Sequence, residues 1–489
     1  MAQIPIKSIV KGSNMNLSPL ITPIDQPYLM NGCSNTWKIG AVTKDTGYAL
    51  VDAQILAGKS ILGLYNFRQV PGTEKMLATV DDATSDDTQL FYKTSAGAWT
   101  EITAAETAWA NKATMAVEME SFIGYCFFVG YGATDGFLPV GSLTGTTFST
   151  TVNVTSMPQG KFIKRYNGKL YVANAYYSGT AYPFRIYSSS YPTAGAITWT
   201  PATDFLDVDY SEEIMGLETA FGNLIAFTEY QTYFYDGSSW TPRWAQGCSA
   251  HRTIKKHKAY MFWCDFDGVQ ISTGGQPQNI SGEIDALYKA GNPRNYFAEI
   301  VNEQYRLYMG NITVGDTTYT NVLATFDIGK SIWFIRELGH TMTTLAKFNN
   351  SGKLQLYMGS SDGMVFSKGE YTDATLLKSD AGLDISASIE LAPFHLDSLD
   401  RYKKLNAIIA FADRPGSLKI FARVLDSSSH ILAAYQPIGQ LTKYINSFDV
   451  DMDDGVIIQI KLTETSQNEY FSFLGYSMDV QLDSVVPKY

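Results

Sequence analysis

The sequence predicts an all-β protein: a β-propeller of about seven blades, preceded by an extended N-terminal arm and followed by a C-terminal β-sandwich. Three observations lead to this prediction. A strand–turn–strand unit recurs through the middle of the chain, the composition is typical of a β protein, and the strand pattern changes near residue 383. The expected boundaries are 1–58 for the arm with a hairpin, 59–382 for the propeller and 383–489 for the sandwich.

The clearest copy of the recurring unit lies in residues 247–281. Ala259–Cys264 is apolar at every position, which is typical of a strand buried on both faces. Asp267-Gly268 then provides a turn, because glycine accepts the positive φ that tight hairpins need. Val269–Ser272 returns with the alternation of a second strand.

The unit repeats at a spacing that fits propeller blades. One apolar anchor from each copy gives Leu77, Phe127, Leu170, Leu224, Tyr260, Leu307 and Leu356. Neighbouring anchors are 36 to 54 residues apart, and a four-stranded blade takes ~40–50 residues. The period alone carries the prediction, since no WD or kelch signature is present. A large irregular β protein with recurring hairpins is the alternative.

The composition supports a β fold and limits the function. Of 489 residues, 17% are charged, and the chain holds 31 Tyr and 26 Phe, a balance typical of strands. So little charge indicates a surface largely covered by partners. The net charge of −11 disfavours tight gripping of duplex phosphates, although an acidic body can surround DNA without holding it.

The cysteines and the N-terminus predict no disulfide framework, export or membrane span. Cys33, Cys126, Cys248 and Cys264 form no CxxC or CxxH pair, which disfavours a disulfide framework or a zinc site. Cys126 and Cys264 lie inside apolar strands and are expected to be buried thiols. The sequence shows neither a signal-peptide core nor an apolar stretch of ~20 residues.

The flanking regions differ from the repeat. Three prolines between Pro19 and Pro27 indicate an extended arm, because proline fixes φ and lacks an N–H. Trp37–Gly40 and Tyr48–Val51 are expected to pair as a hairpin. Short helices are expected at Thr103–Trp109 and Ile284–Ala290. The closing region has six alternating strands, at Asp384–Glu390, Lys404–Ile409, Ser417–Arg423, Val456–Leu462, Tyr470–Leu474 and Ser477–Leu482.

Two segments have the outline of ligand loops. Ala53–Ser60 resembles a phosphate-binding loop, but strand-like Ile61–Phe67 follows where a helix is needed, so we interpret it as a strand linker. Asp449–Gly455 resembles a calcium loop, but Asp454 and Ile460 stand where glycine and glutamate are required. We interpret that segment as an acidic hairpin.

No catalytic set is apparent, and the sequence predicts no catalytic residue, cofactor or metal ligand. Glu212 or Glu213 could pair with Asp207 or Asp209 as acid and base, but an acidic loop beside a blade is the preferred interpretation. The five histidines are scattered, so a triad assembled from distant positions stays open.

One dense basic cluster, Arg252, Lys255, Lys256 and Lys258, is the candidate site. It is either a solvated loop or a surface that faces an acidic partner or passing DNA.

Three groups of residues lie at the start, middle and end of the chain: Asn16–Pro19 with Trp37–Gly40, Gly247–Arg252 with Met261–Ile271 and Gly275–Ser281, and Asp400–Leu405 with Thr465 and Pro487. Together they resemble the tail nozzle, or packaged-DNA stabilisation, proteins of short-tailed bacteriophages. The resemblance spans the chain.

The resemblance implies a structural virion protein and not an enzyme. Copies of the chain would form a homo-oligomeric ring, a hexamer, below the portal–adaptor protein and beside tail fibre or spike proteins. The ring would continue the DNA channel, retain the packaged genome and gate DNA ejection, with double-stranded DNA passing through without sequence-specific binding. The protein would be made in the bacterial cytoplasm and end in the virion tail.

Two other functions remain open. A glycan-binding or glycoside-cleaving tail protein would need a carboxylate pair on the central pocket of the propeller. A receptor-binding protein usually brings a trimeric fibre or coiled coil, and the sequence has no heptad run.

Overall fold

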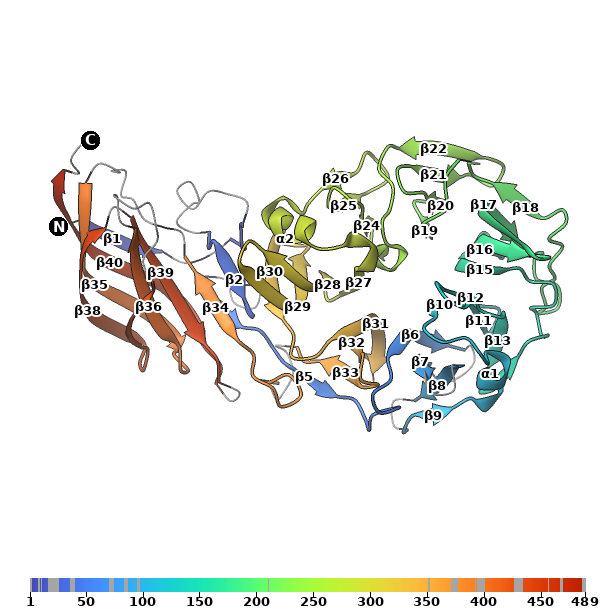
Figure 1. Ribbon diagram of the computed structural model, residues 1–489, viewed down its shortest axis with the longest axis horizontal. Helices are drawn as coiled ribbons and strands as arrows, with labels where there is room; N and C mark the ends of the chain where they lie inside the picture. Colours follow the sequence, from blue (N-terminus) through green and yellow to red (C-terminus); the bar gives the residue numbers. More distant parts are fainter. Residues whose placement is uncertain are drawn as a thin grey trace.

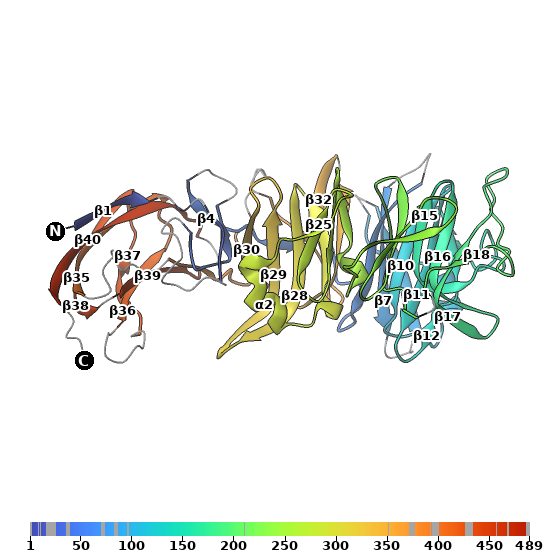
Figure 2. The ribbon, with the colours of Figure 1, turned by 90° about the horizontal axis from the view of Figure 1, so that it is seen from above.

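The computed structural model describes the chain except residues 1, 8, 10, 16–25, 36–39, 70–73, 83–86, 95–96, 210, 351, 371–376, 392, 394–400, 426–433, 456, 467–468 and 486–489. The described residues form an all-β protein, as predicted. Figure 1 shows two parts side by side, a ring of small sheets and a set of longer C-terminal strands, and Figure 2 shows both from above.

The ring contains seven sheets in chain order, each with a path of four antiparallel strands. The first sheet is β6 (Ile61–Arg68), β7 (Glu74–Asp82), β8 (Asp87–Lys93) and β9 (Thr100–Glu101). The second is β10 (Ala116–Phe122), β11 (Tyr125–Gly132), β13 (Gly141–Thr144) and β14 (Thr147–Ser149), with β12 (Gly136–Phe137) beside β11. The third is β15 (Gln159–Tyr166), β16 (Lys169–Tyr177), β17 (Thr180–Ser188) and β18 (Phe205–Asp207). The fourth is β19 (Gly216–Ala220), β20 (Asn223–Phe227), β21 (Thr232–Tyr235) and β22 (Trp240–Trp244).

The remaining sheets complete the circle. The fifth is β23 (Lys255–His257), β24 (Tyr260–Cys264), β25 (Val269–Ser272) and β26 (Gln278–Asn279). The sixth is β27 (Phe297–Val301), β28 (Gln304–Val314), β29 (Thr317–Asp327) and β30 (Ile332–Glu337). The seventh is β31 (Met342–Asn350), β32 (Lys353–Ser360) and β33 (Val365–Lys368), followed by β5 (Tyr48–Leu50) from the N-terminal segment.

The hydrophobic core lies between neighbouring sheets all the way round. Each of seven buried clusters joins residues of two consecutive sheets, in some cases with residues of the segments that connect them. The last cluster joins Phe348 and Val365 of the seventh sheet to Ile61 and Val80 of the first. A closed circle of sheets that pack face to face is the architecture of a β-propeller, so this part of the prediction is confirmed.

The seven sequence anchors each lie on the second strand of a different sheet. Six of them are fully buried, whereas Tyr260 is 38% exposed and the following Met261–Cys264 is buried instead. A second strand has hydrogen-bonded neighbours on both edges and packed sheets on both faces, which explains why it is apolar at successive positions. The recurring sequence unit therefore corresponds to one sheet.

The N-terminal segment closes the ring. In β5, Tyr48 pairs with Lys368 and Leu50 with Phe366 of β33. The ring's last sheet thus takes Tyr48–Leu50. The other side of the predicted hairpin between Trp37–Gly40 and Tyr48–Val51 includes residues 37–39, which lie outside the described residues, so the hairpin stays a prediction. The prolines Pro19 and Pro23 also lie outside them.

The same segment reaches into the C-terminal sheets, so the arm is not separate from the rest. One sheet contains β1 (Ala2–Lys7), β3 (Cys33–Ser34), β4 (Val42–Lys44), β40 (Ser472–Val485), β35 (Arg401–Arg414) and β38 (Ile445–Gly455). The other continues from β30 through β2 (Leu29–Asn31), β34 (Ala387–Glu390), β39 (Ile457–Glu464), β36 (Lys419–Leu425) and β37 (Gln436–Gln440). A single nine-stranded sheet thus runs from the ring into the C-terminal region.

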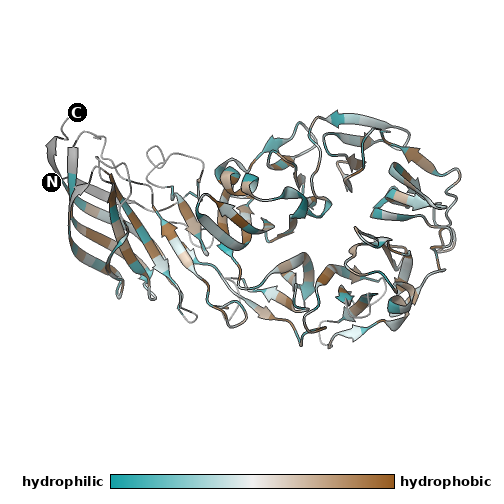
Figure 3. Cartoon of the chain, in the orientation of Figure 1, coloured by the Kyte–Doolittle hydropathy of each residue, from teal (hydrophilic) through white to brown (hydrophobic). Residues whose placement is uncertain are grey.

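A buried cluster lies between these two sheets, with Ile408 and Met478 from one and Ile389, Ile420 and Ile460 from the other. Apolar and polar residues alternate along the strands in Figure 3, which is the predicted pattern for strands with one buried face. The domain boundaries themselves stay a prediction.

Short helices occur where the sequence indicated them, at α1 (Thr103–Ala108) and α2 (Asp285–Ala290). Three 3₁₀ turns, η1 (His251–Thr253), η2 (Gly282–Ile284) and η3 (Pro293–Asn295), complete the described helical elements. All four cysteines are buried free thiols, as was expected for Cys126 and Cys264.

The Asp236-Gly237 turn is not a two-residue type I′ hairpin. It is a four-residue loop in which the Asp236 carboxylate accepts the backbone N–H groups of Ser238 at 2.8 Å and Ser239 at 3.1 Å. Only Gly237 of the two has a positive φ, +109°. The aspartate therefore caps the loop by its side chain, and does not enter the left-handed region.

Gly237→Val is expected to lower the free energy of unfolding by about 1–3 kcal/mol, because a β-branched residue is strained at this φ. Thermal denaturation is the measurement. Gly275→Val is the control, since that position has neither positive φ nor a neighbour within 4 Å of an added Cβ. Equal melting temperatures for both variants would remove the conformational role of Gly237.

Candidate functional site

The first strands of the seven sheets surround a central cavity of about 530 Å³. Each first strand from β6 to β31 contributes, together with η1. The volume falls within the range of small-molecule pockets, ~300–1,000 Å³. The ring axis is therefore the candidate site.

The cavity wall is rich in charge and has an excess of cations. Its described acidic residues are Glu118, Glu120, Glu218 and Glu299. Its basic residues are Lys164, Arg165, Arg252, Lys255, Lys256 and Lys347, and His251 lies among them. Four carboxylates face six cations, whereas acidic residues outnumber basic ones 48 to 37 in the whole chain.

Two of the glutamates bridge pairs of lysines. Glu218 lies 3.1 Å from Lys164 and 3.1 Å from Lys256. Glu299 lies 3.7 Å from Lys255 and 3.5 Å from Lys347. Burial acts to raise the pKa of Glu218, but Lys164 and Lys256 outweigh it and hold that pKa at about 2.

His251 orients a third carboxylate. Its Nε2 lies 3.3 Å from Glu118, and its Nδ1 accepts the backbone N–H of Leu217 at 3.3 Å. The acceptor role of Nδ1 leaves Nε2 as the donor toward Glu118. Burial opposes ionisation of Glu118, yet His251, with Lys164 and Lys255, holds its pKa at about 2.

Glu120 behaves differently from the other carboxylates. Its pKa is raised, mainly by burial and also by Glu218, although Lys164 and Arg165 act in the opposite direction. The cavity thus combines a carboxyl group that keeps its proton to higher pH with others that stay ionised. Environments that push carboxyl pKa values apart are typical of acid–base sites.

The predicted basic cluster is divided between two places. Lys255 and Lys256 line the cavity with Arg252, whose guanidinium donates to the Thr343 carbonyl oxygen at 2.8 Å. Lys258 lies in the turn after β23 and forms an ion pair with a glutamate outside the cavity. A partner- or DNA-facing role for the cluster stays a prediction.

Asp207, Asp209 and Glu213, three of the other sequence candidates, are occupied by structural contacts. Asp207 forms a bidentate ion pair with Arg185, while Lys161 lies 2.5 Å from Glu213. Asp209 accepts from the Tyr233 hydroxyl at 2.8 Å. The Asp449–Gly455 segment lies within strand β38, and the part of the chain that the structure describes has no group of three His, Cys, Asp or Glu placed to hold a metal ion.

Ala53–Ser60 is a linker, as the sequence indicated. Ile55 donates its backbone N–H to Gly363 at 2.9 Å, and strand β6 follows at Ile61. A calorimetric titration of the protein with ATP and magnesium is therefore expected to show no binding heat. Micromolar affinity that disappears in Lys59→Ala would contradict this assignment.

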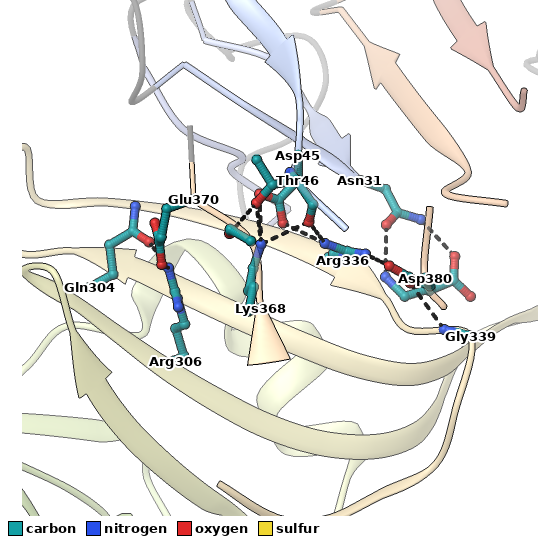
Figure 4. A network of polar contacts seen from close by, with 12 residues as sticks. Asn31, Asp45, Thr46, Gln304, Arg306, Arg336, Gly339, Lys368, Glu370 and Asp380 are labelled. Carbon is teal, nitrogen blue, oxygen red and sulfur yellow. Dashed lines mark hydrogen bonds and ion pairs between the residues drawn. The ribbon is translucent and has the colours of Figure 1, made fainter. Parts of the chain in front are cut away.

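A second charged cluster is buried where the N-terminal segment meets the ring (Figure 4). Arg336 of β30 lies 2.9 Å from Asp45 and also pairs with Asp380. Lys368 of β33 lies 3.2 Å from Asp45 and donates to the Thr46 carbonyl oxygen at 2.9 Å. The cluster fixes the segment that leads into β5 against both the sixth and seventh sheets.

Burial shapes the protonation of this cluster. Burial lowers the pKa of Lys368 to about 8, with Arg336 adding to the effect and Asp45 opposing it. Burial alone would raise the pKa of Asp45, but Lys368 and Arg336 hold it well below its usual range. Because every charge has a partner, the cluster is built for attachment rather than for chemistry.

The sequence reasoning missed the acidic half of the cavity. The first strands carry charges at alternate or isolated positions, such as Glu118 and Glu120 in β10, Glu218 in β19 and Glu299 in β27. Each first strand is the hairpin partner that precedes an anchor strand. Locating the strand just before each anchor strand would have identified the first strand of each sheet. The charges on those first strands would then have been assigned to the axis that the strands share.

No protein-family model matches the chain, and no curated protein matches it. Among solved structures it is similar to the "AfRom2 CNH domain", with a TM-score of 0.42, 8% identity, and coverage of 67% of this chain and 100% of that chain. It is also similar to the Pan2 WD40 domain of Neurospora crassa, with a TM-score of 0.41, 8% identity, and coverage of 68% and 97%. Likenesses at such scores carry no argument about function. In the described part of the chain, no helix has the length and apolar character of a membrane span.

Proposed function

We propose that the chain is a structural subunit of a bacteriophage tail, a nozzle ring that continues the DNA channel below the portal and adaptor. In this proposal the ring retains packaged DNA and gates its ejection. The seven sheets are the blades of a seven-bladed propeller, and the two C-terminal sheets form a β-sandwich.

The observation that supports it best is the path of the N-terminal segment. This segment contributes β1, β3 and β4 to one C-terminal sheet, β2 to the nine-stranded sheet and β5 to the ring. The buried cluster around Arg336 fixes it between them. Such a subunit transmits force between its two parts as one stiff body, which suits a wall that holds DNA under pressure.

The distribution of charge fits an open channel. The central cavity holds more cations than carboxylates, so the rest of the chain is more acidic than the net charge of −11 alone indicates. Acidic residues along a shared lumen would repel DNA and let it slide, whereas a basic lumen would hold it.

An electron cryomicroscopy map of purified virions tests the proposal. We expect copies of this chain in a closed ring on the tail axis, and virions that lack it should lose their DNA. Purified alone, the chain is expected to stay monomeric. A single lateral contact between two copies is weak, whereas a closed ring is stabilised by all of its contacts together. A trimeric spike at the tail periphery would contradict the proposal, as would tight, salt-sensitive binding of duplex DNA.

A glycan-binding or glycoside-cleaving tail protein is the second candidate, because the required carboxylates do lie on the central cavity. Glu120 would act as the proton donor, and Glu118 or Glu218 as the ionised partner. Release of reducing ends from host surface polysaccharide, lost in Glu120→Gln, is the expected result. Equal release by Glu120→Gln would remove this candidate.

A further inference from the structure

Three of the cations that line the central cavity are exposed: Arg165 of β15, Lys256 of β23 and Lys347 of β31. Lys256 and Lys347 each keep an ion pair at the wall. Arg165 forms no ion pair with any residue that the structure describes. The solvent-accessible part of the cavity therefore presents an available guanidinium beside partly compensated ammonium groups.

Arg165, Lys256 and Glu120 line the same cavity. Both interact electrostatically with Glu120, as do Lys164 and Glu218. Glu120 itself has no hydrogen bond or ion pair with a described residue. Among the carboxyl groups of the cavity it is the one whose pKa is raised, mainly by burial. The three side chains come from the first strands β10, β15 and β23, of which β10 and β15 are neighbours. Lys256 of β23 lies beside Glu218 and Thr219 of β19, the first strand between β15 and β23.

We propose that the central cavity binds a small oxyanion, a phosphate- or carboxylate-bearing ligand held by Arg165, Lys256 and Lys164. The guanidinium of Arg165 offers the planar pair of N–H donors that suits two oxygens of such a group. The two ammonium groups add charge from the adjoining wall, and Thr219 supplies a hydroxyl at the same place, 3.1 Å from the Lys256 ammonium.

The size of the cavity determines the class of ligand. About 530 Å³ accommodates a small molecule with two or three anionic groups. Duplex DNA is too large, since its major groove alone is about 12 Å wide. The site therefore differs from the DNA channel of the proposed ring, and it does not depend on that function.

Isothermal titration of the full chain with inorganic pyrophosphate and, separately, with citrate tests the inference. The titrations are run at about 10 mM ionic strength, where the Debye length is about 30 Å. We expect saturable binding of at least one anion, and the tighter of the two identifies phosphate or carboxylate as the preferred group. Absence of binding heat with both would overturn the inference.

Three variants locate the binding. Arg165→Gln is expected to weaken it about tenfold, as the loss of a charge-assisted contact does. Glu120→Gln should strengthen it several-fold by removing the opposing negative charge. Lys258→Gln is the matched control, because it also removes an exposed cation but lies outside the cavity. This variant should bind the anion as tightly as the parent protein does.

Melting temperatures close to that of the parent protein are expected for Arg165→Gln and Lys258→Gln, because both side chains are exposed. Binding that is equally strong in Arg165→Gln would place the anion elsewhere and overturn the inference. So would duplex DNA that binds in an Arg165-dependent way while both small anions do not, because the partner would then be nucleic acid.

Discussion

Arg336→Met is expected to lower the free energy of unfolding by about 3–5 kcal/mol, the usual cost of removing one partner from a buried ion cluster. The Arg336 side chain is 2% exposed, and it compensates both Asp45 and Asp380. Without it, Asp380 loses its ion-pair partner inside the protein and Asp45 keeps only Lys368. Urea denaturation followed by tryptophan fluorescence measures the loss.

Arg294→Met is the matched control, because Arg294 forms an exposed ion pair with Glu229 and its side chain is 56% exposed. Pairs of that kind contribute about 0–1 kcal/mol. Similar shifts of the urea midpoint in the two variants would show that the buried cluster does not hold the N-terminal segment in place.

The same cluster gives a pH dependence with a definite sign. Since the pKa of Asp45 is depressed in the folded protein, its contribution to stability is present above the pKa of an unfolded aspartate, about 3.9. That contribution is lost as the pH falls toward the folded value. Arg336→Met should therefore lose less stability than the parent protein between about pH 5 and pH 2.

Tyr48→Ala is expected to cost about 3–5 kcal/mol, as truncation of a large buried aromatic residue does. Tyr48 is 1% exposed, and its ring centroid lies 4.9 Å from that of Phe366 and 5.8 Å from that of His340. Its hydroxyl lies 2.9 Å from His340 Nδ1. The loss should appear as a lower urea midpoint and as earlier proteolysis of the seventh sheet, which β5 completes.

Tyr230→Ala serves as the control because Tyr230 is 61% exposed, and surface truncations usually stay within about 0.5 kcal/mol. Tyr48→Phe keeps the ring and removes the hydroxyl, so about 1 kcal/mol is expected. If Tyr48→Ala behaved like Tyr230→Ala, β5 would not be needed to close the ring.

The repeating part of the fold could be predicted because its signal is local. A strand flanked on both edges and both faces is apolar at every position, so Leu224 and Leu307 reveal their sheets without knowledge of any partner. The closure of the ring had no comparable local signal in the sequence. β5 pairs with β33, which lies more than 300 residues later. A strand of three residues is too short to show a pattern from which its pairing partner could be predicted.

Only the basic half of the candidate site could be predicted from the sequence. Arg252, Lys255 and Lys256 stand out because they are close together in sequence, whereas Glu118, Glu218 and Glu299 come from three separate sheets. Asp45 and Thr46 gave no signal of their role for a related reason. They have the composition of an exposed turn, yet they fill a buried space opposite Arg336 and Lys368, and only the tertiary structure brings those groups together.

The pairing of β1 with β40 and of β5 with β33 has a consequence for synthesis on the ribosome. Strand β5 needs a partner that is made more than 300 residues later, and β1 needs one made more than 450 residues later. The ring therefore cannot close before β33 is synthesised, and the six-stranded sheet cannot be completed before β40 is. Contacts so distant in sequence make folding slow and leave strand edges open meanwhile. A chain that ends before β40 would keep those edges unpaired, so it would be removed by proteases or aggregate.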